Sequence, residues 1–408
     1  MASPTATTVT RSPLDRVDGI GFPTKRDEAW RYAPHRLLAE LTFGPSTGLP
    51  GGLELDLETR VPVLDGPRIV VVNGIVDHER SVLPAVDGVT VSALADAPAD
   101  AERIHAERRD DEISDAYMAL ELAYATDGAF VDVAPGVHVD VPIHVVDIAV
   151  PGPTTNTSCT GVTIRLAEGS SATVVETRLG VGTDVGGSNV RTTIVLGEAA
   201  NLEHVIVQDL PATQVHLSRV EVDQAAGSTL CARSFNLGGA YGRLAYHVEL
   251  NGAGANAELS GLYFGVGDQV LDQQLTVVHA QPDCTSRQVF RGVLDDASTG
   301  VFNGGIDVRP GADGTDAEQA NDNLLLSDRA EANTQPRLEI LADEVACKHG
   351  ATVGQLDDQA LYYLRSRGIA ADEARRLLIN GFADQVVDEV GVVALRTWIT
   401  HRLGHDDV

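Results

Sequence analysis

A thiol and an imidazole lie two positions apart in the segment Ala342–Leu356, which reads ADEVACKHGATVGQL. These are Cys347 and His349. The segment contains valines and has no helical period, which indicates an extended chain, and residues i and i+2 of a strand point to the same face. Thiolate and imidazole are both good ligands for transition metals. The segment therefore predicts a metal-binding pair on one face of a strand.

Two neighbours define the alternatives for this pair. Lys348 would lie on the opposite face of the strand, and Gly350 would let another backbone approach closely. The competing interpretation is structural, with a buried cysteine acting as a small hydrophobic residue beside a hydrogen-bonded histidine. The segment by itself does not decide between a ligand pair and a packing pair.

The remaining cysteines are widely spaced, at Cys159, Cys231 and Cys284, and no CxxC sequence occurs. This spacing argues against a self-contained zinc site or a redox dithiol. We expect these three cysteines to be small core residues. A metal held at Cys347 would then need ligands from elsewhere.

Composition limits the class of protein and its partners. The chain has 408 residues, of which 43% are hydrophobic, only 4% are aromatic and 40 are glycine, which favours many short strands with tight turns. A net charge of −29 argues against nucleic acid and anionic membranes as partners. The N-terminal residues have no apolar core typical of a secretory signal. We therefore expect a folded protein of the reducing cytoplasm.

A loose repeat occupies the middle of the chain. Similar pieces begin near Glu168, Glu198, Ala226 and Ala253, and aligning them brings together positions 27 to 30 residues apart, namely Ala172, Leu202, Leu230 and Ala257. Each unit has a corner of small residues, an alternating strand and a second strand such as Arg191–Leu196. Repeats of this length without helices predict a β-solenoid, and a β-sandwich is the alternative.

The N-terminal part mixes helices and strands. Pro23 and Thr24 predict the start of a helix in Gly19–Leu38, where Trp30 and Tyr32 either anchor the segment or form a binding cluster. Arg68–Val76 predicts a buried strand followed by an Asn-Gly turn. Asp110–Thr126 has the spacing of an amphipathic helix.

The last fifty residues predict three helices. The first follows Asp357 and ends at Gly368, the second runs from Asp372 to Gly381, and the third spans Phe382–Leu403. Helices of this size need a docking surface, either the solenoid or another protein. The predicted division is a tail and α/β region, a β-helix core and a C-terminal helical region, at residues 1–128, 129–355 and 356–408.

Motifs of several enzyme classes do not occur in the sequence. It contains no GxxxxGK[ST], no GxSxG and no HExxH. One enzymatic alternative is open, because many β-helix proteins cleave polysaccharides with carboxylates, and Asp307, Asp313, Asp316 and Asp322 could form such a site. Scarce aromatic residues and the missing secretory signal argue against it.

Two stretches resemble the SufB/SufD family of iron–sulfur cluster assembly scaffolds. They are KRDEAWRYAP at Lys25–Pro34 and the long run Phe302–Phe382. The resemblance implies a right-handed parallel β-helix between helical terminal regions. Within the family the chain looks like the SufD branch, because His349-Gly350-Ala351 stands where SufB-like chains have His-Glu-Ala.

The resemblance also implies partners and a cofactor. It implies a complex with a SufB paralogue, paired through the β-helices, and with the SufC ATPase, bound through the C-terminal helices. A transient iron–sulfur cluster would form at the interface with SufB, with His349 as a ligand and Cys347 beside it as a second candidate ligand. The chain would be a non-catalytic scaffold. Apart from the resemblance, an exposed strand edge at the end of a solenoid can also pair with a second copy, so the isolated chain is expected to self-associate and could form a homodimer. A purely structural partner of SufB is the alternative.

Overall fold

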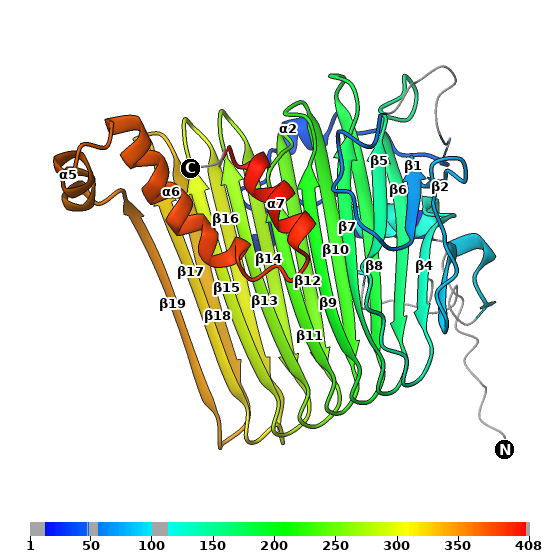
Figure 1. Cartoon of the computed structure of the whole chain (residues 1–408). Coiled ribbons are helices and arrows are strands. Elements are labelled where there is room, and N and C mark those ends of the chain that lie inside the picture. The colour runs from blue at the N-terminus through cyan, green and yellow to red at the C-terminus, as the bar shows by residue number, and fades with distance from the viewer. Residues whose placement is uncertain (1–12, 47, 49–55, 100–112, 405–408) are drawn as a thin grey trace.

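Two facing β-sheets make up most of the molecule (Figure 1). The computed structural model describes residues 13–46, 48, 56–99 and 113–404. One sheet has ten strands in the order β19-β17-β15-β13-β11-β9-β7-β5-β1-β2, and the other has nine in the order β18-β16-β14-β12-β10-β8-β6-β4-β3. From β4 to β19, consecutive strands alternate between the sheets, so the chain coils. The predicted β-solenoid is confirmed, and the sandwich alternative is wrong.

The elements have the following bounds. The helices and 3₁₀ turns are α1 (Pro13–Ile20), η1 (Glu28–Trp30), α2 (His35–Leu38), η2 (Leu94–Asp96), α4 (Ala116–Tyr124), α5 (Asp358–Ser366), α6 (Ala371–Val387) and α7 (Val393–Arg402). The strands are β1 (Arg68–Val72), β2 (Ile75–Val76), β3 (Val89–Ala93), β4 (Gly128–Val133), β5 (Ile143–Ala149), β6 (Thr157–Leu166), β7 (Ser171–Gly180), β8 (Gly186–Leu196), β9 (Asn201–Asp209), β10 (Gln214–Gln224), β11 (Thr229–Asn236), β12 (Tyr241–Leu250), β13 (Asn256–Gly265), β14 (Val270–His279), β15 (Thr285–Leu294), β16 (Thr299–Val308), β17 (Asp316–Leu325), β18 (Glu331–Ile340) and β19 (Ala346–Gln355).

The sequence repeat is the coil of the solenoid. Ala172 pairs with Leu202, Leu202 with Leu230, and Leu230 with Ala257, each in parallel register on successive strands of the ten-stranded sheet. These positions point inward and are buried. The alignment that defined the repeat is therefore the register of the sheet.

Each coil turns at one corner through the same backbone conformation. The corner residue has a positive φ in successive coils, including +55° at Ala199 and +64° at Gly227. The next residue is small and fully buried, as at Ala200 and Ser228, because it turns into the space between the sheets. Cys284 occupies this corner position in a later coil, directly after Asp283 at φ +59°. The cysteine is thus a small core residue, as predicted.

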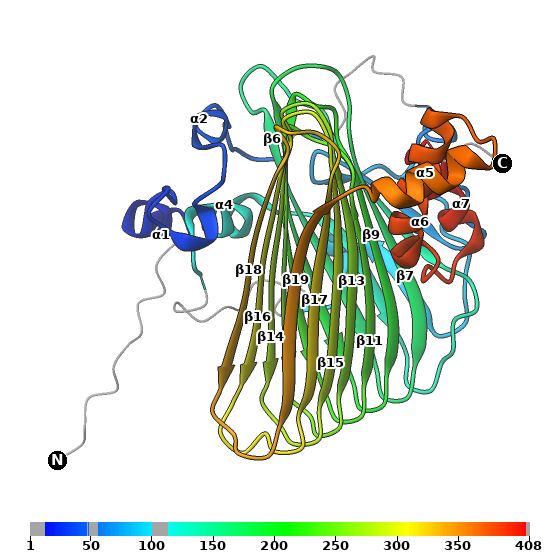
Figure 2. The ribbon, with the colours of Figure 1, turned by 90° about the vertical axis from the view of Figure 1, so that its left-hand side faces the viewer.

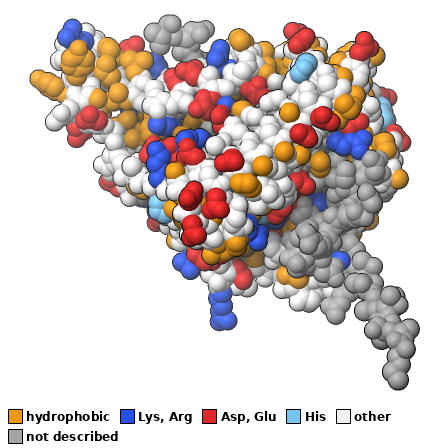
Figure 3. All heavy atoms as spheres, turned by 90° about the horizontal axis from the view of Figure 1, so that it is seen from below, with side chains coloured by type: hydrophobic (Ala, Val, Ile, Leu, Met, Phe, Trp, Pro, Cys, Tyr) orange, Lys and Arg blue, Asp and Glu red, His pale blue; other side chains and the backbone are white. Residues whose placement is uncertain are grey.

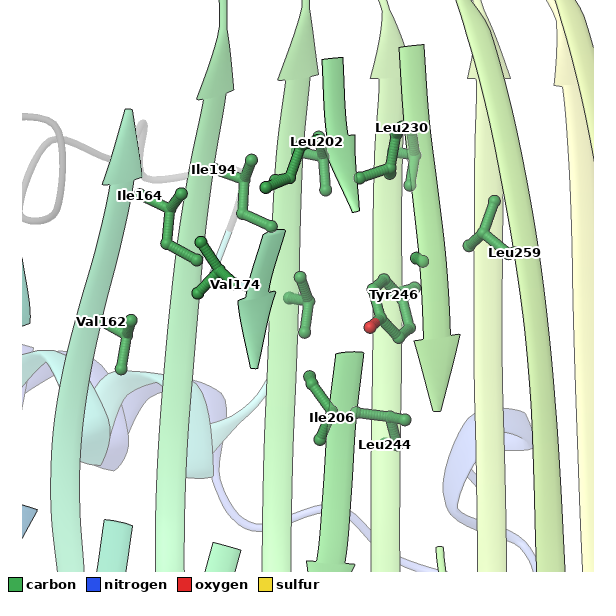
Figure 4. Close-up of a cluster of buried hydrophobic side chains, with 14 of the residues drawn as sticks. Val162, Ile164, Val174, Ile194, Leu202, Ile206, Leu230, Leu244, Tyr246 and Leu259 are labelled. Atoms are coloured by element: carbon green, nitrogen blue, oxygen red, sulfur yellow. The ribbon is translucent and has the colours of Figure 1, made fainter. Parts of the chain in front are cut away.

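The space between the sheets is mostly apolar. Figure 4 shows inward side chains of both sheets in contact across it, among them Ile164, Ile194, Leu202, Leu230 and Leu259. Each of these residues is at most 2% exposed. Burying a side chain of this size contributes about 1.5–3 kcal/mol, so the stacked coils supply a continuous core.

A charged cluster interrupts this core. Glu176 pairs with Arg178 on β7, and its carboxylate also lies 2.7 Å from Nε2 of His204 and accepts a 2.9 Å hydrogen bond from Thr192. Glu176, Arg178, Thr192 and His204 are fully buried. Burial raises the pKa of the Glu176 carboxyl, but Arg178 and His204 outweigh it and lower this pKa to about 2.

The N-terminal segments lie against the outer face of the nine-stranded sheet (Figure 2). The expected helix after Pro23 is instead the single turn η1 followed by α2, because Pro34 lacks an N–H and separates the two. The expected helix Asp110–Thr126 begins only at Ala116, where the Asp115 side chain accepts a 3.0 Å hydrogen bond from the Met118 amide. Its first part, residues 110–112, lies outside the described residues.

The strand Arg68–Val76 folds as predicted. Strand β1 pairs in parallel with β5, and β2 returns antiparallel to β1 after Asn73 and Gly74, which both have positive φ. An Asn-Gly pair favours this tight turn because both positions require a left-handed backbone.

Helices α6 and α7 pack on the outer face of the ten-stranded sheet. The expected break at Gly381 is wrong, because α6 continues through it to Val387, and the third expected helix is only α7. A glycine inside a helix costs about 1 kcal/mol. Burial of Ala383, Val386 and Val387 against the sheet exceeds that cost. The first helix ends before Gly368, as predicted.

We expect Glu176→Gln to lower the free energy of unfolding by about 3–5 kcal/mol at neutral pH, because it leaves Arg178 buried without a counter-charge. A carboxyl whose pKa falls on folding stabilises the folded state above its unfolded pKa of 4.5. The difference in unfolding free energy between the variant and the wild type should therefore be constant near neutral pH and shrink as the pH falls below 4.5.

Urea unfolding followed by circular dichroism at several pH values measures this difference. The exposed corner substitution Glu198→Gln is the matched control and should leave stability unchanged. Equal unfolding free energies for Glu176→Gln and wild type at pH 7 would contradict the role of Glu176 as the stabilising counter-charge of Arg178.

Candidate functional site

The last coil leaves one end of the solenoid open. Strand β19 pairs with β17 on one side, and its other edge has no strand beside it in the described chain, as Figure 2 shows for the end that faces the viewer. Strand β18 is the matching edge of the other sheet. The interior of the solenoid, closed along its length by stacked coils, is therefore accessible at β18 and β19.

The segment that carries the thiol and the imidazole is the edge strand itself. In parallel register, Cys347 lies beside Ala317 and His349 beside Gln319. Both β17 neighbours are buried and point inward, so Cys347 and His349 share the inward face, as predicted. Lys348 points to the outer face, where its ammonium lies 3.0 Å from Glu318.

Both candidate ligands are accessible because no further coil covers them. Cys347 is half-buried and packs against the apolar group that includes Ile306 and Ala317, whereas His349 is exposed. The structural interpretation required a buried Cys347, but its position on the edge strand leaves it only partly covered. A Cβ at Gly350 would meet no atom within 4 Å, so the backbone there is open to approach.

The local charges oppose ionisation of the thiol. Burial raises the pKa of Cys347, and the negative charge of Asp316 adds to the shift. A thiolate is the metal-binding form of cysteine. Cys347 is therefore protonated near neutral pH until a cation compensates the charge.

The remaining cysteines do not converge on this site. Cys159 is fully buried with its sulfur 3.8 Å from the Leu120 carbonyl oxygen, and Cys284 is buried at its corner. Cys231 was also expected in the core, but it lies half-exposed on an outer face, 4.0 Å from Glu258. Within the described residues, no group of three or more His, Cys, Asp and Glu side chains could hold a metal ion.

The four aspartates of the polysaccharide-cleaving alternative do not form a site. Asp307 lies on β16 beside Arg337, and Asp316 and Asp322 lie on β17 in the other sheet, six residues and about 20 Å apart. Asp313 lies in the turn before β17 and accepts hydrogen bonds from backbone amides. The structure therefore provides no paired carboxylates at these positions.

The N-terminal aromatic cluster is a packing anchor. Trp30 is buried, and the Arg243 guanidinium lies 3.9 Å from its ring centroid while pairing with Asp272 at 2.6 Å. A cleft of about 450 Å³ lies beside it, lined also by Arg219 and Arg337. These arginines are already paired with neighbouring carboxylates. The cluster thus holds the N-terminal segment on the sheet, which was the packing interpretation.

Sequence reasoning missed a polar row inside the solenoid. Gln288 and Gln319 lie in register with His349 on β15, β17 and β19. The sequence does contain a sign of this row, because its three residues are separated by about one coil each. This spacing can be recognised only once the register of the coils is known.

Comparison with known proteins identifies the family. The family model described as SUF system FeS cluster assembly, SufBD core domain, matches residues 150–382, and the SufBD protein N-terminal region matches residues 7–145. The chain belongs to the SufBD family. Its core domain covers nearly all solenoid strands and part of α6.

Individual SufBD proteins are similar over nearly the whole chain. The iron–sulfur cluster assembly protein SufD of Escherichia coli is 31% identical, covering 96% of this chain and 90% of the relative. A SufBD family protein of Mycobacterium leprae is also 31% identical, covering 96% and 92%. One from Mycobacterium tuberculosis is 36% identical over 65% of this chain and 68% of the relative. The resemblance to SufD inferred from the sequence motifs is confirmed.

No helix in the described part of this SufBD chain is long and apolar enough to cross a membrane.

We expect the four thiols to react with an alkylating reagent in two classes. Cys231 and Cys347 are partly exposed and should be labelled first, and the fully buried Cys159 and Cys284 should react at least about tenfold more slowly. Because the pKa of Cys347 is raised from 9.0, its labelling rate should keep rising as pH passes that value. Peptide mass spectrometry after timed labelling gives each rate.

The denatured chain is the control and should label all four cysteines alike. Cys347→Ser should remove only its own labelled peptide. Labelling of Cys159 as fast as Cys347 in the folded chain would contradict the described burial.

Proposed function

We propose that this protein is a non-catalytic scaffold subunit of an iron–sulfur cluster assembly complex of the SUF type. It would pair with a SufB-type paralogue through the open end of its solenoid and bind the SufC ATPase through its C-terminal helices. A nascent cluster would form between the two solenoids. The observation that carries the proposal is the inward-facing Cys347 and His349 on the unpaired edge strand β19.

The open end is suited to a second solenoid. Strand β19 contains no proline and presents a row of backbone N–H and C=O groups to a further strand. Ile340, Leu341 and Val353 are exposed by 40%, 57% and 49% around it. A paralogous β-helix could cover these side chains and continue the sheet. In the isolated chain, the same edge would support a homodimer about a two-fold axis.

The donor set supports a shared site. Iron–sulfur clusters take about four protein ligands, mostly thiolates. Cys347 and His349 supply at most two, so a partner would supply the others. Bound iron would favour loss of the Cys347 proton and the neutral form of His349, and assembly should therefore weaken in acid. The cluster would be cargo, built at the interface and passed on.

We expect His349→Ala to reduce strongly the iron and sulfide recovered per complex after anaerobic reconstitution, because it removes the exposed imidazole ligand. The same change should leave the complex with SufB and SufC intact, since this side chain has no role in the core. Cys347→Ala should reduce the recovered iron and sulfide less than His349→Ala does. Mössbauer spectra and size-exclusion chromatography provide the two measurements.

The matched control is His78→Ala, an exposed histidine near the other end of the solenoid. Wild-type cluster content in an intact His349→Ala complex would reject the ligand role. That result would favour the alternative of a purely structural partner of SufB.

The C-terminal helices offer an ATPase docking surface on α5 and the outer side of α6. Helices α6 and α7 and the connection between them cover the solenoid, because they bury Val386, Val390, Leu395 and Ile399 against the sheet. Helix α5 buries no residue and projects beyond the last coil (Figure 1). Its Tyr362 is 76% exposed, and hydrophobic side chains gather at that corner in the view from below (Figure 3).

We expect Tyr362→Ala and Tyr363→Ala each to weaken SufC binding by about 2 kcal/mol, roughly thirtyfold in Kd, because exposed aromatic residues are frequent interface anchors. Deletion of all residues after Gly354 is less informative, since it would also uncover the apolar face beneath α6 and α7. Isothermal titration of the purified chain with SufC measures Kd.

Val393→Ala on α7 is the matched control, because Val393 is 63% exposed and lies on a different helix. If both tyrosine variants bind SufC like wild type, α5 is not the docking surface and the helices only cover the solenoid.

We also propose that the three regions, 1–128, 129–355 and 356–408, divide the tasks of the scaffold. The first would anchor the N-terminal segment, the second would pair with SufB and hold the cluster ligands, and the third would bind SufC. A reducing cytoplasm is the proposed compartment, in keeping with four free cysteines.

A further inference from the structure

A row of three polar side chains crosses the inner face of the last coils. Gln288 on β15, Gln319 on β17 and His349 on β19 occupy the same register position. Neighbouring strands of a sheet are about 4.8 Å apart, so each side chain stacks beside the next. Gln288 and Gln319 are 0% and 2% exposed, whereas His349 ends the row at the open edge.

The two amides are joined, and the chain of hydrogen bonds stops one step before the histidine. Nε2 of Gln319 donates a 2.7 Å hydrogen bond to Oε1 of Gln288. Oε1 of Gln319 is buried and accepts no hydrogen bond from any described residue. A buried acceptor without a donor is costly, and proteins supply a partner at nearly all such sites.

The facing sheet leaves space for this amide. Gly304 on β16 lies opposite Gln319, and a Cβ there would lie 2.7 Å from the Gln319 Cδ atom and 2.7 Å from Phe302. Only a residue without a side chain leaves room for the amide. The Gln319 amide therefore lies against the Gly304 backbone, with its Nε2 hydrogen-bonded to Gln288.

The imidazole of His349 is the adjacent donor in the row. Its strand is the next one in the sheet, and it points to the same inner face as Gln319. A neutral imidazole carries one N–H donor and one nitrogen with a free lone pair, and the hydrogen bond made by the first decides which nitrogen is free. Metal-ligating histidines use this device, with the second nitrogen bonded to a carbonyl or carboxylate.

We propose that Gln319 is a positioning residue for His349. Its Oε1 accepts a hydrogen bond from one ring nitrogen, which fixes the tautomer and orientation of the imidazole and leaves the other nitrogen directed to the open end. The hydrogen bond to Gln288 orients the Gln319 amide, and the Gln319 amide in turn orients the imidazole at the exposed edge. The role toward iron rests on the proposed function, whereas the hydrogen bond and the fixed tautomer do not.

The tautomer of His349 in the isolated full-length chain tests this inference directly. The chain is labelled with ¹⁵N-histidine and studied by long-range proton–nitrogen correlation at about pH 8, where imidazole is neutral. His349→Gln identifies the signals. Wild type should show one dominant tautomer, and Gln319→Leu should shift the tautomer ratio at least about fivefold, the factor that corresponds to one ordinary hydrogen bond.

Two further variants separate positioning from packing. Gln319→Glu keeps an acceptor oxygen and should preserve the wild-type tautomer, with Gln288 turning its own amide to donate. Gln335→Leu changes a partly buried glutamine of β18 on the outer face of the same coil and should have no effect. Circular dichroism checks that each variant keeps the fold.

The outcomes distinguish this inference from the proposed function. An unchanged tautomer in folded Gln319→Leu overturns the positioning role, whatever the cluster does. If the tautomer shifts, iron affinity of the complex with SufB should fall about 10- to 100-fold, as for other groups that orient metal ligands. A tautomer shift together with full cluster content in His349→Ala would uphold the hydrogen bond and reject the ligand function.

Discussion

Parallel hydrogen bonding between successive coils is the constraint on which the rest of the structure depends. Each strand satisfies the backbone groups of the strand before it and needs the strand after it. This requirement passes along β5, β7, β9 and onward, and in the described part of the chain no strand meets it at β19. A solenoid therefore ends either in a cap or in a partner. The inward-facing thiol and imidazole lie at this end of the solenoid, on the edge strand β19.

In-register stacking also determines the chemistry inside the solenoid. Residues one coil apart become neighbours, so a polar residue in the core needs a polar residue on the next coil. Gln319 finds its register partner Gln288, and Glu176 finds His204 on the next strand of its sheet, two positions away from its own register partner Ile206. In rows of this kind, each side chain restricts the conformation of its neighbour on the next coil, so side chains are ordered along the axis of the solenoid. His349 is the end of one such row.

The sequence predicted the coil well because small corner residues and alternating strands recur with it. The alignment of Ala172 with Leu202 proved to be the register of the sheet. Helix boundaries were less predictable. Gly381 resembles a helix end, but packing of α6 on the sheet outweighs its low helix propensity. Burial of Cys347 was not predictable either, because it depends on β19 having no successor, which is a property of the assembled sheet.

The placement of α6 and α7 has a mechanical consequence. Their apolar side chains rest on Val175, Val205, Phe235, Leu262 and Val293, which come from five successive strands of one sheet, β7 to β15. Linear arrays of repeats lose structure from their ends, one unit at a time. A helix pair that packs across five coils acts as a brace, because none of these five coils can separate from its neighbours without losing its contacts with the helices. The brace thereby holds the centre of the ten-stranded sheet together as far as β15, two strands from the edge strand β19, so opening of the solenoid at that end would stop where the brace begins.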